Sequence, residues 1–214
     1  MDNPFNLVVP QEDEVMVNEK SVKEISDKIK DRIKNRRLIV LVGDYGSGKT
    51  LYLNRLLGRL KTKKQLISFN DAIINMLEGK VPVKNKTVFI EHFDLMHGLD
   101  KKQIYRLTKA MIRLLDEGMI IVITCRKDTL RKLLNTNPLL QSHTNRIKIP
   151  KLTFKEAEKL VIKRLNKARD EERDDVSPFS KSELRTVWRK ADKNPRLLLL
   201  LLRPLYEQRM MIKE

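Results

Sequence analysis

The chain has 214 residues and 41% hydrophobic content, with 45 Lys and Arg against 28 Asp and Glu, so its formal net charge is +17. This length suffices for one hydrophobic core, or one core with a small satellite domain, and a single cysteine excludes a disulfide scaffold. The longest apolar run, residues 197–202, is far shorter than the ~18 residues of a membrane span. The N-terminal residues lack the basic and apolar order of a secretory signal, so we expect a cytoplasmic protein without a membrane partner.

The first 37 residues carry eight basic and eight acidic groups, and their pattern predicts an extended lead-in followed by a helix over about 22–34. The charge excess is greatest in residues 38–150, where 20 basic residues face 9 acidic ones. Short apolar runs alternate there with longer amphipathic segments, an order typical of a parallel, doubly wound α/β sheet. Five strands are predicted, over Leu38 to Val42, Gln65 to Phe69, Thr87 to Ile90, Met119 to Thr124 and Ile147 to Ile149. The helices between them are predicted at about 49–60, 71–78, 101–117 and 128–136.

After Pro150 the strand-like runs stop, and three helices are predicted, over Phe154 to Asp170, Lys181 to Lys190 and Asn194 to Met210. An acidic, Ser-Pro-containing stretch separates the first two of these helices. We therefore expect an α/β domain over residues 1–150 and a small helical domain over residues 151–214.

A glycine-rich loop lies directly between the first predicted strand and the first helix that follows it. It fits the pattern G-x-x-x-x-G-K-[ST] and consists of Gly43, Asp44, Tyr45, Gly46, Ser47, Gly48, Lys49 and Thr50. Glycines let successive backbone N–H groups face an anion, and the positive end of the following helix adds to the attraction. Lys49 is expected to reach the β- and γ-phosphates, and Thr50 to be a ligand of Mg²⁺. The sequence thus predicts a site for ATP or ADP with Mg²⁺, which includes the next residue, Leu51.

The third strand is followed by Glu91, His92 and, two positions later, Asp94. A phosphate-loop enzyme needs an acidic residue at such a strand end, to hold Mg²⁺ and to position an attacking water. Here the sequence resembles the AAA+ ATPases, in particular the archaeal origin-recognition-type replication initiators and the related transposition-helper and STAND ATPases. Their usual order is four apolar residues, Asp, Glu and often a later Asp. This chain has Glu91 in the Asp position, as a metal ligand, and His92 in place of the catalytic Glu.

His92 has two interpretations, which the sequence leaves open. It can act as a general base if its pKa stays near neutrality, or it can only pack at the strand end of a site that binds ATP and turns it over slowly. Either interpretation predicts nucleotide binding, and the two differ in whether His92 supports hydrolysis.

The resemblance also implies a five-stranded AAA+ sheet with a helical lid, and roles for residues far from the loop. Thr124, at the end of the fourth strand, would sense the γ-phosphate. Arg146 would reach the nucleotide of a neighbouring subunit, and Arg196, at the start of the third lid helix, would contact the γ-phosphate from the lid. Pro4, Phe5 and the stretch around Val17 would cover the adenine. For Arg146, the alternative is a surface arginine, and for the adenine-covering segments it is ordinary packing.

Four basic residues, Lys102, Arg106, Lys109 and Arg113, recur at spacings that put them on one face of the helix predicted over 101–117. We call them the basic stripe. A second cluster follows the fourth strand and consists of Arg126, Lys127, Arg131 and Lys132. Since only 5% of the residues are aromatic, phosphate contacts rather than base stacking would carry any affinity for DNA. The alternative is a solvated basic surface.

These observations favour an ATP-binding AAA+-type protein that acts on or near DNA, as a slow ATPase in replication, transposition or mobile-element function. It would form an ATP-dependent homo-oligomer or bind a protein partner. No winged-helix segment follows the lid helices, so DNA contacts are expected through the ATPase core or a partner. The rival interpretation is a STAND-like regulatory switch or an inactive ATP-holding scaffold that acts through protein contacts.

Overall fold

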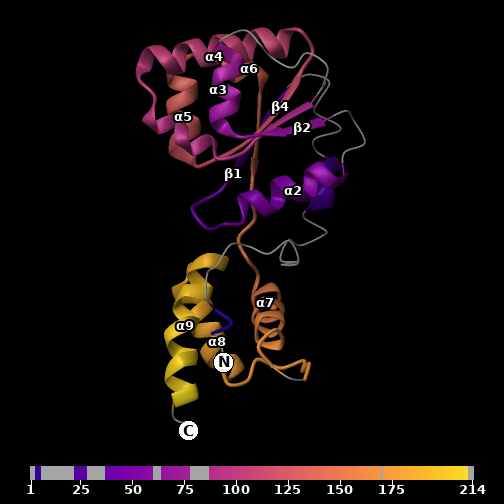
Figure 1. The fold of residues 1–214 in the computed structure, drawn as a ribbon, viewed down its shortest axis with the longest axis vertical. Coiled ribbons are helices and arrows are strands. Elements are labelled where there is room, and N and C mark those ends of the chain that lie inside the picture. The colour runs from indigo at the N-terminus through magenta and orange to yellow at the C-terminus, as the bar shows by residue number, and fades with distance from the viewer. Residues whose placement is uncertain are drawn as a thin grey trace. The chain divides into compact units, whose positions relative to one another are not determined.

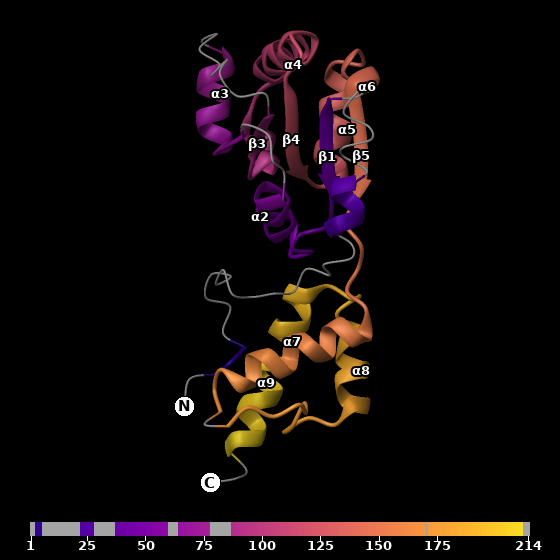
Figure 2. The same ribbon diagram turned by 90° about the vertical axis from the view of Figure 1, so that its right-hand side faces the viewer.

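The computed structural model describes residues 3–5, 22–27, 37–59, 64–77, 87–169 and 171–211. The contacts between its residues divide the chain into two compact units. Figures 1 and 2 show the chain coloured by residue number, from indigo at the N-terminus to yellow at the C-terminus. The sheet unit comprises residues 19–45 and 49–149, and the helical unit comprises residues 1–18, 46–48 and 150–214.

The sheet unit is built on five parallel strands in the order β2-β3-β4-β1-β5, which confirms the predicted α/β fold. The strands are β1 (Leu38–Val42), β2 (Lys64–Ile67), β3 (Thr87–Ile90), β4 (Ile120–Cys125) and β5 (Thr144–Lys148). Every residue of β1, β3 and β4 is buried, as expected for central strands that helices cover on both faces.

Helices cover the two faces of this sheet unequally. They are α2 (Lys49–Arg59), α3 (Phe69–Leu77), α4 (Lys101–Asp116), α5 (Lys127–Thr136) and α6 (Leu140–His143), with a short 3₁₀ helix, η1 (Phe93–Gly98). Figure 1 shows α3, α4 and α5 on one side of the strands and α2 on the other. The alternate strand residues Val40, Ile121 and Ile123 pack with buried residues of α3, α4 and α5 in one core cluster. Side chains alternate along a strand, so Ile39 and Val122 face the side of α2.

The strand at the edge of the sheet differs most from its prediction. The apolar run predicted a strand over Ile147 to Ile149, but β5 begins at Thr144 and ends at Lys148. An edge strand pairs with one neighbour only, so its outward residues can be polar: Arg146 and Lys148 are exposed, while Ile147 between them is buried. The short helices η1 and α6 were not predicted either, and Phe69, predicted as the end of a strand, begins α3.

The helical unit consists of α7 (Phe154–Asn166), α8 (Lys181–Lys190) and α9 (Pro195–Met211), close to the three helices that the sequence predicted. Phe5 is fully buried in the core of this unit. Its ring centroid lies 5.9 Å from that of Phe179 and 5.6 Å from that of Tyr206. Phe5, which the resemblance placed in an adenine-covering segment with ordinary packing as the alternative, is therefore a core residue of the helical unit.

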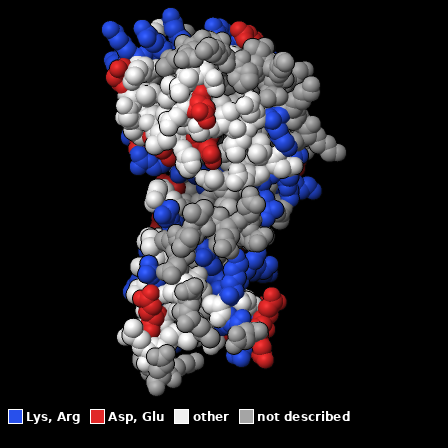
Figure 3. Space-filling view, viewed as in Figure 1, with Lys and Arg blue, Asp and Glu red and all other residues white. Residues whose placement is uncertain are grey.

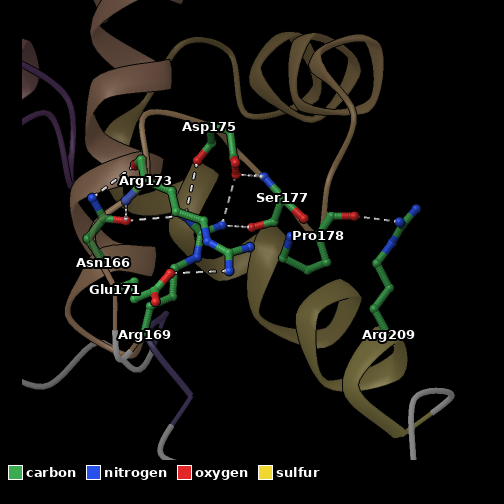
Figure 4. A network of polar contacts seen from close by, with 8 residues as sticks. All are labelled: Asn166, Arg169, Glu171, Arg173, Asp175, Ser177, Pro178 and Arg209. Carbon is green, nitrogen blue, oxygen red and sulfur yellow. Dashed lines mark hydrogen bonds and ion pairs between the residues drawn. The ribbon is translucent and has the colours of Figure 1, made fainter.

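A polar network explains why α7 ends at Asn166 rather than near 170. The Asn166 side-chain amide donates to the carbonyl oxygen of Arg173 at 3.0 Å and accepts from the backbone N–H of Arg173 at 3.2 Å. These two bonds fix the loop that follows α7 against the last residue of the helix. Figure 4 shows this network, in which Arg169 also binds the carboxylate of Asp175 at 3.2 Å. Arg209 of α9 donates to the carbonyl oxygen of Pro178 at 2.6 Å.

The leucine run at the start of α9 is buried unevenly. Leu198, Leu199 and Leu202 are buried, but Leu197 and Leu200 are 40% and 44% exposed. The run therefore buries one helix face. Among the helices of the described residues, none is long and apolar enough to cross a membrane.

Candidate nucleotide-binding site

Three loop segments meet at the carboxyl end of the sheet because the strands that precede them are parallel. β4 lies between β1 and β3, with Val42 opposite Cys125 and Ile90 opposite Ile123. The Gly43 N–H, just after β1, donates to the carbonyl oxygen of Cys125 at 3.2 Å. The segments that follow β1, β3 and β4 therefore meet at the carboxyl end of the sheet, where parallel α/β folds bind ligands.

The glycine-rich loop has the backbone that the motif predicts. Gly46 and Gly48 have φ angles of 76° and 86°, in the left-handed region that favours glycine. Lys49 is the first residue of α2, so the loop runs directly into a helix N-terminus. The Ser47 hydroxyl oxygen is buried and has no hydrogen-bond partner among the described residues. A buried hydroxyl in a loop at a helix N-terminus fits the phosphate of a nucleotide.

Lys49 turns its ammonium group back onto the loop. Its Nζ donates to the carbonyl oxygens of Gly43 and Asp44, at 3.1 Å each. It also lies 3.7 Å from Oδ2 of Asp94. The Lys49 ammonium group therefore lies at the carboxyl end of the sheet, between the glycine-rich loop and the segment after β3.

Asp94 ties that segment to the start of α5. Its Oδ1 accepts from the backbone N–H of Arg126 at 2.7 Å and from the Thr129 hydroxyl at 2.6 Å. Sequence reasoning placed Asp94 in a catalytic motif and missed this capping role, because its partners lie 32 and 35 residues away.

Glu91 and His92 lie at the end of β3, where the sequence analysis expected a metal ligand and a base. Their side chains are 26% and 63% exposed, and His92 Nε2 is 3.8 Å from Glu91 Oε2. His92 has a φ of 55°, a left-handed conformation that is uncommon for a residue other than glycine. The described residues contain no group of three or more His, Cys, Asp or Glu suited to a metal ion. One carboxylate, a threonine and substrate phosphates are nevertheless an ordinary set for Mg²⁺, and Thr50 and Glu91 fit it.

The other predicted site residues are distributed over both units. Thr124 is buried in β4 opposite Leu41, and Leu51 is half-buried in α2. Arg146 is exposed in β5, and Arg196 is exposed at the second position of α9, in the helical unit. Val17 lies outside the described residues. The roles of these residues at a nucleotide remain predictions.

Cys125 is a buried thiol beside the site. It is fully buried, and burial together with the negative charge of Asp94 raises the pKa of its thiol to about 12.

All four residues of the basic stripe are exposed on α4, while Ile104, Leu107 and Met111 on the other face are buried. Tyr105, 45% exposed, lies within the stripe, and Lys109 Nζ is 5.3 Å from the centre of its ring. Figure 3 shows Lys and Arg side chains gathered over one end of this helix.

The second basic cluster divides into two kinds of residue. Lys127 and Arg131 are exposed on α5, and Lys132 is half-buried. The Arg126 side chain instead lies between two carboxylates, with Nη2 3.0 Å from Asp128 Oδ2 and Nε 3.9 Å from Asp94 Oδ1.

No protein-family model and no curated protein matches this sequence. Solved structures do match. The Thermotoga maritima RuvB Holliday junction branch migration motor is 16% identical, with a TM-score of 0.58 over 95% of this chain and 67% of that one. The Aeropyrum pernix Orc1 protein in complex with DNA is 16% identical, with a TM-score of 0.53 over 96% of this chain and 62% of that one. The Saccharomyces cerevisiae Hsp104–ADP complex is 14% identical, with a TM-score of 0.56 over 86% and 30%.

These neighbours are AAA+ ATPases, and the chain has their fold. It spans about two thirds of the RuvB chain and less of the other two.

Proposed function

We propose that this protein binds ATP with Mg²⁺ at the loop between β1 and α2. The observation that carries the proposal is the loop itself, with Gly46 and Gly48 in left-handed conformations and Lys49 at the first position of α2. Backbone N–H groups and the helix N-terminus attract the phosphates, and Lys49 exchanges its bonds with loop carbonyls for phosphate oxygens. Thr50 and Glu91 would hold Mg²⁺, which neutralises phosphate charge when bound.

The nucleotide test compares Lys49→Ala with the wild type by calorimetry, with Lys102→Ala as a control that removes the same charge from exposed α4. We expect Lys49→Ala to lose detectable ATP binding, because no other group supplies its contact with the phosphates, and Lys102→Ala to bind as the wild type does. Equal binding by all three proteins would refute the loop assignment.

Hydrolysis by the isolated protein is expected to be slow. His92 replaces the glutamate usual in the resembling family, and losing a positioned general base costs ~10²- to 10⁴-fold in rate. With its side chain 63% exposed beside Glu91, His92 is open to solvent. His92→Glu should therefore raise turnover, measured as phosphate release. Fast turnover by the wild type that His92→Ala leaves unchanged would assign the base to another residue.

We further propose that the basic stripe contacts the phosphates of duplex DNA with little sequence preference. Its four side chains are exposed on one helix face, in a chain with a net charge of +17. Among the structural neighbours, one is a Holliday junction motor and another was solved in complex with DNA.

Salt dependence tests the DNA proposal. Each phosphate contact contributes about 0.9 to the slope of log affinity against log salt, so the double reversal Lys102→Glu with Arg106→Glu should flatten that slope by about 2. Lys155→Glu with Lys159→Glu, on exposed positions of α7, is the matched control and should change it less. Absence of DNA binding near physiological salt, with and without ATP, would refute the proposal.

The second candidate function is a regulatory ATP switch that acts through protein contacts in the cytoplasm, and Glu91-His92 favours it because this pair departs from the usual catalytic order.

In either function, ATP is expected to promote assembly through Arg146 and lid closure through Arg196. Light scattering of Arg146→Ala should show weaker ATP-dependent assembly. Identical masses for the apo, ADP and ATP states of the wild type would refute this.

A further inference from the structure

A hollow of about 790 Å³ lies beside the basic stripe of α4, and this volume is within the range of sites that hold small ligands. Its apolar wall is made by Met76 of α3, Ala110 and Ile112 of α4, and Leu139 ahead of α6. Leu139 is 72% exposed, so the apolar wall reaches the surface of the protein. Phosphate groups make no use of such a wall, so contacts between the stripe and a DNA backbone leave the hollow unexplained.

Side chains on successive turns of α4 join this hollow to the basic stripe. Tyr105, Lys109 and Arg113 all line the hollow, and their spacing along the helix places them one above another on its surface. Tyr105 is 45% exposed, and Lys109 Nζ lies 5.3 Å from the centre of its ring. Proteins hold unpaired nucleotides with aromatic side chains beside cations, because the ring stacks on the base while the cations contact the phosphates.

We propose that the hollow takes an unpaired base of a DNA strand whose phosphates lie on the basic stripe, with the base stacked on the Tyr105 ring. The proposal rests on the DNA function proposed above and adds the class of DNA, one with an unpaired or displaced base. In a duplex every base is stacked between its neighbours, whereas an unpaired base leaves the stack at little cost in free energy. A base in the hollow also covers apolar surface that otherwise meets water, and its own phosphate lies next to Lys109.

Two carboxylates at the C-terminal end of α4 orient the nucleotide. Asp116 and Glu117 both line the hollow. They repel phosphates, so the DNA backbone lies toward Lys102 and Arg106, nearer the other end of the helix, and the base faces Asp116. The Asp116 side chain is 61% exposed, and its carboxylate can accept a hydrogen bond from the exocyclic amino group of adenine. Adenine has both this amino group and a large ring surface, so it is the base used in the test.

The test compares three labelled duplexes by fluorescence anisotropy: a fully paired duplex, the same duplex with a single bulged adenine, and the same bulge without its base. For the wild-type protein we expect the bulged adenine to raise affinity about 5- to 100-fold over the paired duplex, the range for one base stacked on an aromatic ring. The abasic bulge should bind as the paired duplex does. The slope of log affinity against log salt should be the same for all three DNAs, because stacking releases no counterions.

Variants of the ring separate stacking from charge. Tyr105→Ala should lose the advantage of the bulged adenine and keep its affinity for the paired duplex, whereas Tyr105→Phe should keep both. Ile74→Ala removes another exposed apolar side chain, one that does not line the hollow, so it is the matched control and should bind all three DNAs as the wild type does. Thermal unfolding checks that the variants fold. If Tyr105→Ala does not fold, the abasic comparison on the wild-type protein decides.

Equal affinity of the wild type for the paired, bulged and abasic DNAs would overturn the proposal and leave the hollow to a protein partner. An advantage of the bulge that persists in Tyr105→Ala would also overturn it, because bending of the DNA would then explain the effect. So would an advantage that comes with a salt slope steeper by about 0.9, which marks one more phosphate contact. Failure of the DNA function itself is distinguishable, since none of the three DNAs would then bind, and the inference would fail with it.

Discussion

Replacing Asp94 tests whether the segment after β3 is fixed to α5 by a single oxygen atom. Its Oδ1 accepts two short hydrogen bonds, from the Arg126 N–H and the Thr129 hydroxyl, while Oδ2 lies 3.7 Å from Lys49 Nζ. The two oxygens therefore have separable roles. Asp94→Asn can keep an acceptor in the Oδ1 position and lose the charge, whereas Asp94→Ala loses both.

The magnitudes of the two losses differ. A hydrogen bond to a charged group contributes about 1.5–3 kcal/mol. The Asp94 side chain is 30% exposed, so water replaces part of that contribution. We expect Asp94→Ala to lower the free energy of unfolding by about 2–4 kcal/mol. The contact with Lys49 is long and partly solvated, so Asp94→Asn should cost about 1 kcal/mol or less.

Urea unfolding followed by circular dichroism measures this difference at constant protein concentration. The variants should keep the slope of free energy against urea and differ in midpoint. Equal destabilisation by Ala and Asn would show that the charge rather than the acceptor matters, and wild-type stability of Asp94→Ala would refute the capping role.

Three further predictions concern other parts of the structure. Phe5→Ala removes a fully buried ring from the helical unit and should cost about 3–5 kcal/mol, measured by urea unfolding with the fluorescence of Trp188, the single tryptophan of the chain; a loss below about 1 kcal/mol would contradict its burial. Cys125, with its thiol pKa raised to about 12, should resist iodoacetamide at pH 8 until denaturant unfolds the chain, and fast labelling of the native protein, seen by mass spectrometry, would contradict this. Hydrogen bonds from Ser180 lower the pKa of Glu183 below its ordinary 4.5, so the ionised carboxylate stabilises the fold above pH 4.5. This contribution is lost as the pH falls through the lowered pKa. Ser180→Ala should lower the free energy of unfolding by about 1 kcal/mol at pH 7 and flatten the fall of Tm between pH 5 and 3.

The sequence by itself determined the features that depend on neighbouring residues. β1 and β3 have the predicted bounds, and α8 begins and ends as predicted, because an apolar run or a capping residue acts within one or two turns of chain. The phosphate-binding loop is likewise local, since glycine spacing and the lysine that follows specify both its backbone and its position before α2. The AAA+ fold could be predicted for the same reason, from the order of these local signals.

Tertiary structure alone decided which of the charged residues meet. The sequence does not encode in any local pattern that β4 lies between β3 and β1, and this strand order brings Asp94 to the N-terminus of α5, 32 residues away. Arg126 looks like its basic neighbours in the sequence, yet its side chain lies beside Asp128, two residues on, and beside Asp94, which only folding brings to it. For Phe5 the sequence left open an adenine-covering role or ordinary packing, and the structure packs its ring against Phe179 and Tyr206, near the other end of the chain. Burial and ion pairing over such separations depend on which surfaces the folded chain presents to one another, and that is a property of the packed structure rather than of any short stretch of sequence.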